Sequence, residues 1–316
     1  RHQGGQDSRW QTAVNYSAVS DIDYLNDIGA NIGAASSQPF MTPFDMSQAN
    51  RRSPGLDQLA QTLYRGKDWL ASVTVRDFQN LDLFDPQQYA VLPMLALEHR
   101  ARSGRWQLAS RLEYARFDKS DSPLTVDPND PRDLLRITGE RATAALELSY
   151  PYQQRWGFVT PGVKLIHRQY RLDNTRAGAD QRPGLTTRTF YLDAGLMFTR
   201  PIKLGSTALD QTLEPRMFYL YTGEQDQQAL PLFDVSTLTP GYAQLFRINR
   251  FTGGDRTADA NQLSLGLTTR LLNPRNGRQL LAASIGQIQH FKDRRVTLYP
   301  SSLDAYTAAR SPLFTE

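Results

Sequence analysis

The chain has 316 residues, of which 36 are lysine or arginine and 32 are aspartate or glutamate, for a formal net charge of +4. No basic block is long enough to track a phosphate backbone, which argues against nucleic acid as a partner. The chain contains no cysteine, which excludes a disulfide framework and a thiolate metal site, and no run of eighteen apolar residues predicts a transmembrane helix.

Alternation of apolar and polar residues predicts about twelve β-strands. In 134–150, for example, Leu146 and Leu148 fall on one face while Arg141 and Glu147 fall on the other. In chain order the strands are expected at 10–19, 24–34, 58–65, 69–79, 90–101, 105–117, 134–150, 156–172, 188–200, 207–221, 261–272 and 279–291.

Short and long connectors alternate along nearly the whole chain. Tight turns are expected near 20–23, 65–68, 103–104, 151–155, 201–206 and 273–278, and long polar connectors at 35–57, 80–89, 118–133, 173–187 and 222–260. Bacterial outer-membrane barrels have tight periplasmic turns and extended external loops, and their strands need roughly 9–11 residues to cross the bilayer. The sequence therefore predicts an all-β fold, an antiparallel up-and-down transmembrane β-barrel of which this chain supplies part.

Such strands turn apolar side chains to lipid and polar ones to the barrel interior. Aromatic residues near strand ends, such as Trp106 and Trp156, suit the headgroup level because their rings are amphipathic. The charged residues expected on the interior face are Arg111, Glu113, Arg141, Glu147, Asp193, Glu214, Arg216 and Arg270.

The sequence offers no anchor for catalysis. It contains neither a Gly-x-Ser-x-Gly elbow nor a phosphate-binding glycine loop, and its four histidines lack the short spacings of a zinc site. Asp127, Asp130 and Asp133 are near enough in sequence to bind a divalent cation, but the prolines between them fit a rigid turn. We predict a protein that is not an enzyme and has no cofactor or metal.

One stretch, 245–270, closely resembles the signature region of the LptD family of lipopolysaccharide-assembly outer-membrane proteins. Further agreement comes from 214–221, 230–234, 19–24 and 64–78. The residues that carry the match are Asn249, Arg250, Phe251, Gly254, Asp255, Arg256, Asp259, Ala260, Asn261 and Gln262.

The resemblance implies a large barrel in the bacterial outer membrane, plugged from inside by the lipoprotein LptE. It implies that the barrel receives lipopolysaccharide from a periplasmic Lpt bridge and releases it sideways into the outer leaflet. The family's periplasmic jellyroll domain, cysteine pairs and closing strands have no counterpart in these residues. We therefore expect residues 1–316 to be an internal portion of one barrel domain, with edges that need further strands.

The charges of the signature stretch suggest a hypothesis about its shape. Arg247, Arg250, Asp255, Arg256 and Asp259 fall in a long connector that can fold inward and pair its charges, or remain a solvated loop.

Two other functions fit parts of the pattern. A porin or receptor barrel for small solutes has the same alternation, and only the family resemblance separates it from a lipopolysaccharide transporter. A soluble, secreted β-sandwich that binds or cleaves glycans would bury the apolar faces between two sheets, and Glu147 or Glu214 would supply its acid.

Overall fold

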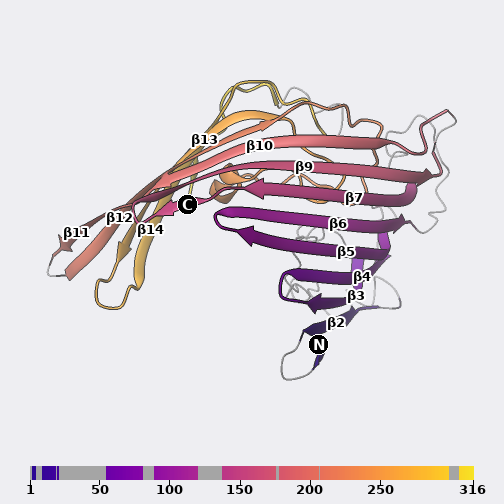
Figure 1. Cartoon of the computed structure of the whole chain (residues 1–316), viewed down its shortest axis with the longest axis horizontal. Coiled ribbons are helices and arrows are strands. Elements are labelled where there is room, and N and C mark those ends of the chain that lie inside the picture. The colour runs from indigo at the N-terminus through magenta and orange to yellow at the C-terminus, as the bar shows by residue number, and fades with distance from the viewer. Residues whose placement is uncertain are drawn as a thin grey trace.

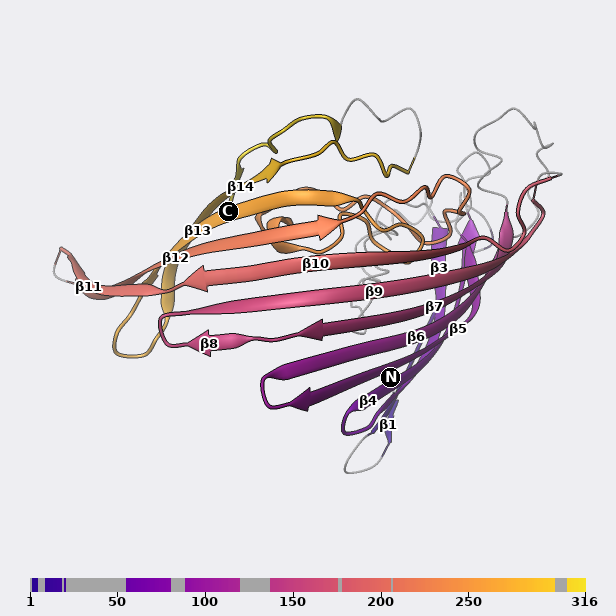
Figure 2. The ribbon, with the colours of Figure 1, turned by 45° about the horizontal axis from the view of Figure 1, so that its top comes forward.

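The computed structural model describes residues 2–4, 9–18, 20, 55–80, 89–119, 137–175, 178–205, 207–298 and 306–316. Within them the chain forms one 15-stranded antiparallel sheet and a short 3-10 helix, η4 (Tyr242–Phe246). None of the helices in this part of the chain is long and apolar enough to cross a membrane. The sheet is a curved, open wall, with β1 at one edge and β15 at the other (Figures 1 and 2).

Each strand of the main path is hydrogen-bonded to the next one along the chain, so the order is up-and-down. β8 and β11 are extensions of this path that pair with β9 and β12. The strands are β1 (His2–Gly4), β2 (Trp10–Tyr16), β3 (Gly55–Arg65), β4 (Trp69–Asn80), β5 (Ala90–Ser103), β6 (Trp106–Asp118), β7 (Thr138–Ser149), β8 (Tyr152–Gln154), β9 (Gly157–Asp173), β10 (Gly184–Leu196), β11 (Phe198–Leu204), β12 (Thr207–Thr222), β13 (Ala260–Leu272), β14 (Gln279–His290) and β15 (Phe314–Thr315).

The expected strands coincide with observed ones, with one exception. The segment 24–34 lies outside the described residues, as do the turn expected at 20–23, apart from Ser20, and most of the connector 35–57. An up-and-down order would place a strand at 24–34 between β2 and β3. These two strands pair directly and antiparallel, from Trp10 with Tyr64 to Tyr16 with Gln58, so the expected order is wrong at this point.

The other connectors follow the predicted alternation. At one end of the sheet, tight turns make every second connection between adjacent strands. One of these turns contains Gly104, whose φ is +58°. A positive φ is readily adopted by glycine because it lacks a Cβ atom. The turn expected at 201–206 is shorter than predicted, because β11 continues the pairing with β12 as far as Leu204 opposite Thr207.

The two faces of the sheet differ as the alternation predicts. Leu112, Leu265 and Leu267 are 58%, 52% and 39% exposed, and all point away from the connectors. No second sheet covers this outer face in the described residues, which is the opposite of the dry interior that a β-sandwich requires. The outer face is therefore a broad apolar surface.

Apolar clusters lie on the opposite, inner face, near the end of the sheet that carries the long connectors. The prediction of a polar interior is therefore incomplete, because β5, β6 and β9 present apolar side chains on this face and the connector between β12 and β13 packs its own against them. The largest cluster consists of Tyr89, Val91, Met94, Ala115, Phe117, Tyr170, Leu172, Leu230 and Phe233.

Candidate functional site

The connector 223–259, here called the inner segment, folds onto the inner face rather than extending into solvent (Figure 2). Phe233 stacks on Phe117 of β6, with ring centroids 4.4 Å apart and planes 12° apart. Phe246 and Ile248 pack against a second cluster, Phe218, Leu220 and Ala260. Burial of these side chains stabilises the inward course of the segment.

Arg141 of β7 connects the inner segment to the sheet, and its side chain is 0% exposed. Its Nη1 donates to Asp234 Oδ1 at 2.8 Å and to Asp255 Oδ1 at 2.7 Å. Its Nη2 donates to Asp234 Oδ2 at 2.7 Å and to Glu113 Oε1 at 2.9 Å. The guanidinium also lies 4.9 Å from the centre of the Phe117 ring. One buried cation thus binds two carboxylates of the inner segment and one of β6.

Asp255 is fully buried, with an exposed fraction of 0%, and accepts hydrogen bonds from several donors. Besides Arg141, these are the Tyr170 hydroxyl at 3.0 Å and the backbone N–H groups of Phe233 at 2.6 Å and Asp234 at 3.0 Å. Such donors offset the cost of burying a carboxylate. Asp255 therefore holds both limbs of the inner segment against the sheet.

Asp234 is held in its ionised form. Burial favours the neutral acid, but the charge of Arg141 and the hydrogen bonds donated by Arg141 and by Gly254 N–H outweigh it and keep the pKa of Asp234 below its ordinary value. Because its pKa is lowered by folding, the ionised Asp234 carboxylate stabilises the fold at pH values above the ordinary aspartate pKa. This stabilisation is lost as the pH falls through the lowered pKa.

Two glycines allow the inner segment to approach this cluster. Gly253 has a φ of +65°, and a Cβ atom there would lie 2.1 Å from the carbonyl oxygen of Asp234. A Cβ atom at Gly254 would lie 2.4 Å from Cζ of Arg141. Only glycine fits either position without displacing the charged groups.

The other residues of the family signature hold the inner segment together. Asn249 bridges the segment by donating to the Arg256 carbonyl at 3.0 Å and accepting from Ala258 N–H at 2.9 Å. Arg256 donates to the carbonyl oxygens of Leu230 and Pro231 at 2.8 and 3.0 Å.

Asp259 connects the signature to the chain after β14. It accepts from Arg250 at 3.1 Å and from the backbone N–H groups of Arg295 and Val296. Phe251 is buried in a third cluster with Ala258 and Val296. On β13, Asn261 accepts from the Tyr219 hydroxyl at 3.1 Å, and Gln262 lies on the inner face opposite His290.

The hypothesis of an inward, charge-paired connector agrees with this geometry, with three differences. Arg250 and Asp259 do pair with each other, but Asp255 pairs with Arg141 of the sheet rather than with an arginine of the segment. Arg256 binds backbone carbonyls, and Arg247 is exposed and forms no ion pair among the described residues.

All eight charged residues expected on the interior lie on the inner face, and neighbouring strands pair them. Arg111 contacts Glu98 and Glu113, the latter at 2.6 Å. The remaining pairs are Glu147 with Lys164 at 3.3 Å, Arg216 with Asp193 at 2.6 Å, Arg270 with Glu214 at 2.6 Å, and Arg141 with Glu113. These ion pairs, most of them between neighbouring strands, offset the charges of the eight residues.

A cavity of about 330 Å³ lies between the inner face and the inner segment. On the sheet side its wall comes from β5, β6, β7, β9 and Thr189 of β10. Most of the inner-segment residues that line it lie within 247–254. The charged residues that line it are Glu98, Arg100, Arg111, Glu113, Glu147, Lys164, Arg168 and Arg247.

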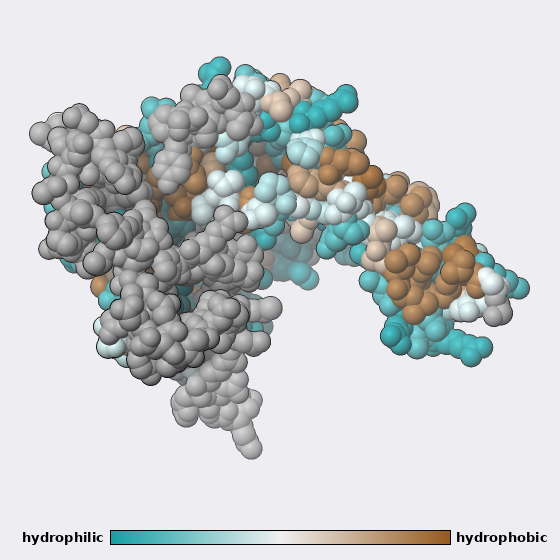
Figure 3. Space-filling view, turned by 180° about the vertical axis from the view of Figure 1, so that it is seen from behind, coloured by the Kyte–Doolittle hydropathy of each residue, from teal (hydrophilic) through white to brown (hydrophobic). Residues whose placement is uncertain are grey.

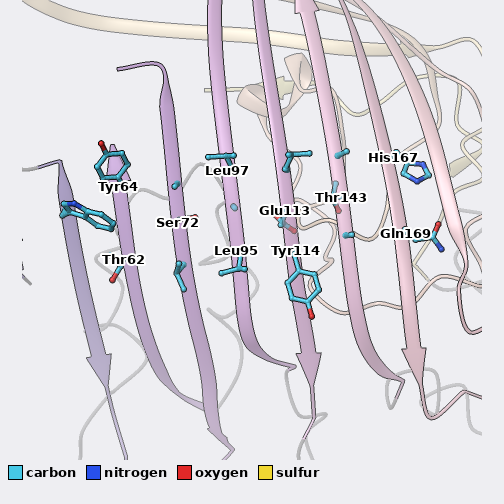
Figure 4. A pocket seen from close by; sticks show the side chains of 17 residues that line it. Thr62, Tyr64, Ser72, Leu95, Leu97, Glu113, Tyr114, Thr143, His167 and Gln169 are labelled. Atoms are coloured by element: carbon cyan, nitrogen blue, oxygen red, sulfur yellow. The ribbon is translucent and has the colours of Figure 1, made fainter. Parts of the chain in front are cut away.

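A shallow groove of about 600 Å³ crosses the outer face from β2 to β9 (Figure 4). Its lining is mostly apolar, with small residues such as Ala142 and Ala144 beside Leu95, Leu97 and Tyr114. At the tight-turn end of this face Trp10 packs on Tyr64, and Trp106 on Tyr150, with ring centroids 4.8 and 4.9 Å apart. These aromatic pairs occupy the strand ends where the sequence predicts an interfacial belt.

The sequence alone does not single out Asp234, Tyr170, Arg168 or Gly253 as functional residues, although 230–234 is part of the family resemblance. Their partners lie on distant strands, and no local periodicity reveals such contacts. The aspartates at 127, 130 and 133 lie outside the described residues, within which no group of three His, Asp or Glu residues is arranged to hold a metal ion.

Comparison with known proteins agrees with this architecture. The profile of the family "LPS transport system D", LptD, matches residues 1–316. LPS-assembly protein LptD of Alkalilimnicola ehrlichii is 36% identical over 95% of this chain and 37% of its own length. The proteins of the same name from Hahella chejuensis and Pseudomonas aeruginosa are 31% and 33% identical over 92% and 93% of this chain. The chain spans about a third of the length of these relatives, from 32% to 37%.

Proposed function

Because this chain belongs to the LptD family, we propose that it forms part of the barrel that transports lipopolysaccharide and inserts it into the outer leaflet of the outer membrane. The family match over residues 1–316 is the observation that carries this proposal. LptD proteins are outer-membrane β-barrels of Gram-negative bacteria, and the bacterial outer membrane is the location of this chain.

The two faces of the sheet support a wall between lipid and an aqueous interior. The exposed leucines of the outer face suit acyl chains, because burying them in hydrocarbon removes apolar surface from water. The inner face carries paired charges, which water and opposite charges satisfy in an aqueous interior. Such an interior suits a polar cargo. We assign Arg111, Glu113, Arg141, Glu147, Asp193, Glu214, Arg216 and Arg270 to the lumen on this basis.

We further propose that residues 1–316 belong to a single barrel domain that works with other parts. The LptE lipoprotein would enter the lumen, and a domain outside this chain would receive lipopolysaccharide from the periplasmic Lpt bridge. Both partners follow from the family. Among the described strands none pairs with the outer side of β1 or β15, and such edges need further strands in lipid.

The alternatives have less support. A soluble glycan-binding or glycan-cleaving sandwich conflicts with the exposed outer leucines, and its suspected acids Glu147 and Glu214 are paired with Lys164 and Arg270. A porin for small solutes shares the alternation but not the family match. Transfer of an amphiphile requires no bond chemistry, so we assign no catalytic residue.

A depletion experiment tests the proposal. The full-length protein, carried on a plasmid, should restore the arrival of new lipopolysaccharide at the cell surface when the resident LptD is depleted. Surface arrival is measured with an impermeant label for lipopolysaccharide, and a general outer-membrane porin expressed at the same level is the control. Correct insertion of the protein without any recovery of surface lipopolysaccharide would refute the proposal.

A further inference from the structure

Arg168 of β9 lines the cavity beneath the inner segment and is only 3% exposed. Its Nη2 donates to Thr257 Oγ1 at 2.8 Å. Its Nε and Nη1 have no hydrogen-bond partner among the described residues, and neither does Thr143 Oγ1. Thr143 lies directly opposite Arg168 on β7 and lines the same cavity. Arg168 and Thr143 are therefore neighbouring, buried polar residues with unused hydrogen-bonding capacity.

The charges around the cavity favour an anion there. Its three carboxylates are already engaged, since Glu98 and Glu113 contact Arg111 and Glu147 contacts Lys164. Arg168, Arg100 and Arg247 also line it, and none of them forms an ion pair in the part of the chain that the structure describes. Arg100 and Arg247 are exposed, so the positive charge extends from the buried guanidinium towards solvent.

We propose that Arg168 and Thr143 form a binding site for the phosphate group of an anionic glycolipid headgroup. A guanidinium presents N–H donors in a fixed fork that matches phosphate oxygens, and a threonine hydroxyl supplies a further donor. A cavity of about 330 Å³ is large enough for a phosphorylated headgroup fragment, since one water molecule occupies about 30 Å³ of liquid. This inference rests on the proposed function, because it assigns one contact point on the route of the lipopolysaccharide.

The site differs from the Arg141 cluster in its chemistry. Arg141 binds three carboxylates of the protein, so its donors are already directed to fixed anions. Among the described residues, Arg168 faces no carboxylate at hydrogen-bonding distance, and its hydrogen-bond partner is the neutral hydroxyl of Thr257. Arg141 therefore positions the inner segment, whereas Arg168 is available to a ligand.

Binding of glucosamine 6-phosphate to the purified full-length protein in complex with its lipoprotein tests this site. Titration calorimetry would compare wild type with Arg168→Gln, Thr143→Val and Arg171→Gln. Arg171 is a matched control, because it is exposed on the same strand but points to the outer face. Gluconate, of similar size, measures whether a carboxylate serves equally well.

We expect Arg168→Gln to weaken phosphate binding at least about tenfold, Thr143→Val a few-fold, and Arg171→Gln not at all. Affinity within twofold of wild type in Arg168→Gln, an equal loss in Arg171→Gln, or equal binding of gluconate would each overturn the inference. If Arg168→Gln fails to assemble, Thr143→Val decides the question. Surface delivery of lipopolysaccharide is scored separately, so a protein that delivers it without binding phosphate at Arg168 refutes this site and leaves the proposed function intact.

Discussion

At the residue scale, the central feature is a buried cation surrounded by carboxylates from distant parts of the chain. Arg141 is separated by 93 residues from Asp234 and by 114 from Asp255. Removing one partner of a buried ion pair is costlier than removing both, because it leaves uncompensated charge in a dry environment. The inner segment should therefore depend strongly on this one side chain.

Replacing Arg141 with Met should lower the free energy of unfolding by about 3–5 kcal/mol, since Glu113, Asp234 and Asp255 would stay buried without their cation. The expected result is a lower thermal midpoint and faster proteolysis within 223–259, measured on the purified full-length protein. Arg155→Met, in an exposed turn, is the control and should change neither quantity. Equal behaviour of the two variants would contradict the assignment.

A second prediction at this scale separates steric exclusion from backbone strain. Gly253→Ala and Gly104→Ala both place a side chain at a positive φ, +65° and +58°, but a Cβ atom at Gly104 meets nothing within 4 Å. Gly104→Ala should cost roughly 1–2 kcal/mol from strain alone. Gly253→Ala should cost clearly more and should also expose the inner segment to protease. Similar thermal midpoints for the two variants would show that the contact with Asp234 is unimportant.

At the element scale, each strand carries one lipid-facing and one inward face, and most of this arrangement could be predicted from sequence. Alternation with period two is a local property, so it predicts the opposite faces on which exposed Leu146 and buried Arg141 lie. The neighbour of β2 could not be predicted, because pairing with β3 depends on contacts across a long connector. The partners of Arg141 could not be predicted from the sequence for the same reason, because Asp234 and Asp255 lie far from it along the chain.

Placing an arginine on the outer face tests the membrane assignment of the strands. Leu112→Arg should cost about 2–4 kcal/mol if the position faces the bilayer midplane, and less near an interface. We expect less folded barrel in the outer membrane, assayed by heat-modifiable migration in gels. Gln153→Arg, at an exposed position of the short strand β8, should leave the amount unchanged. If the outer face met water instead of lipid, neither substitution would change the amount of folded barrel, and the membrane assignment would be wrong.

The signature arginines test the inner segment as a unit. Arg250→Ala and Arg256→Ala each remove hydrogen bonds to buried carbonyl groups, so each should cost about 1–3 kcal/mol. Both should reduce assembly or co-purification with the plug lipoprotein more than Arg247→Ala, whose side chain is exposed. Co-purification that is the same for all three variants would remove the link between signature and plug docking.

At the scale of the whole molecule, an open, curved sheet carries a folded segment on its hollow side. Figure 3 views the molecule from that side and shows hydrophobic surface over the projecting β11–β12 and β13–β14 hairpins. Leu204 and Leu280, 66% and 51% exposed, belong to these hairpins. The inner segment packs on the hollow side of this open sheet, away from these hairpin tips.

Shortening the inner segment should make the complete barrel leaky. Replacing 225–257 with a short glycine–serine linker removes the apolar anchors and the carboxylates that bind Arg141, so small hydrophilic solutes should enter cells faster. Uptake of a fluorescent dye that normally stays outside measures this. A linker in place of 178–183, in the β9–β10 connector, is the control. Unchanged dye uptake would mean that the segment does not limit passage.

The long sequence separation between Arg141 and its two aspartates has a consequence for the order of events in folding. Closing a loop of this size carries an entropic cost that is recovered only when many contacts form together, so distant pairings form late. β6, β7 and β9 must already lie side by side before Asp234 and Asp255 find their common guanidinium. Insertion of that guanidinium between them is therefore a terminal step, and a nascent protein that stalls earlier would still present the segment to periplasmic proteases.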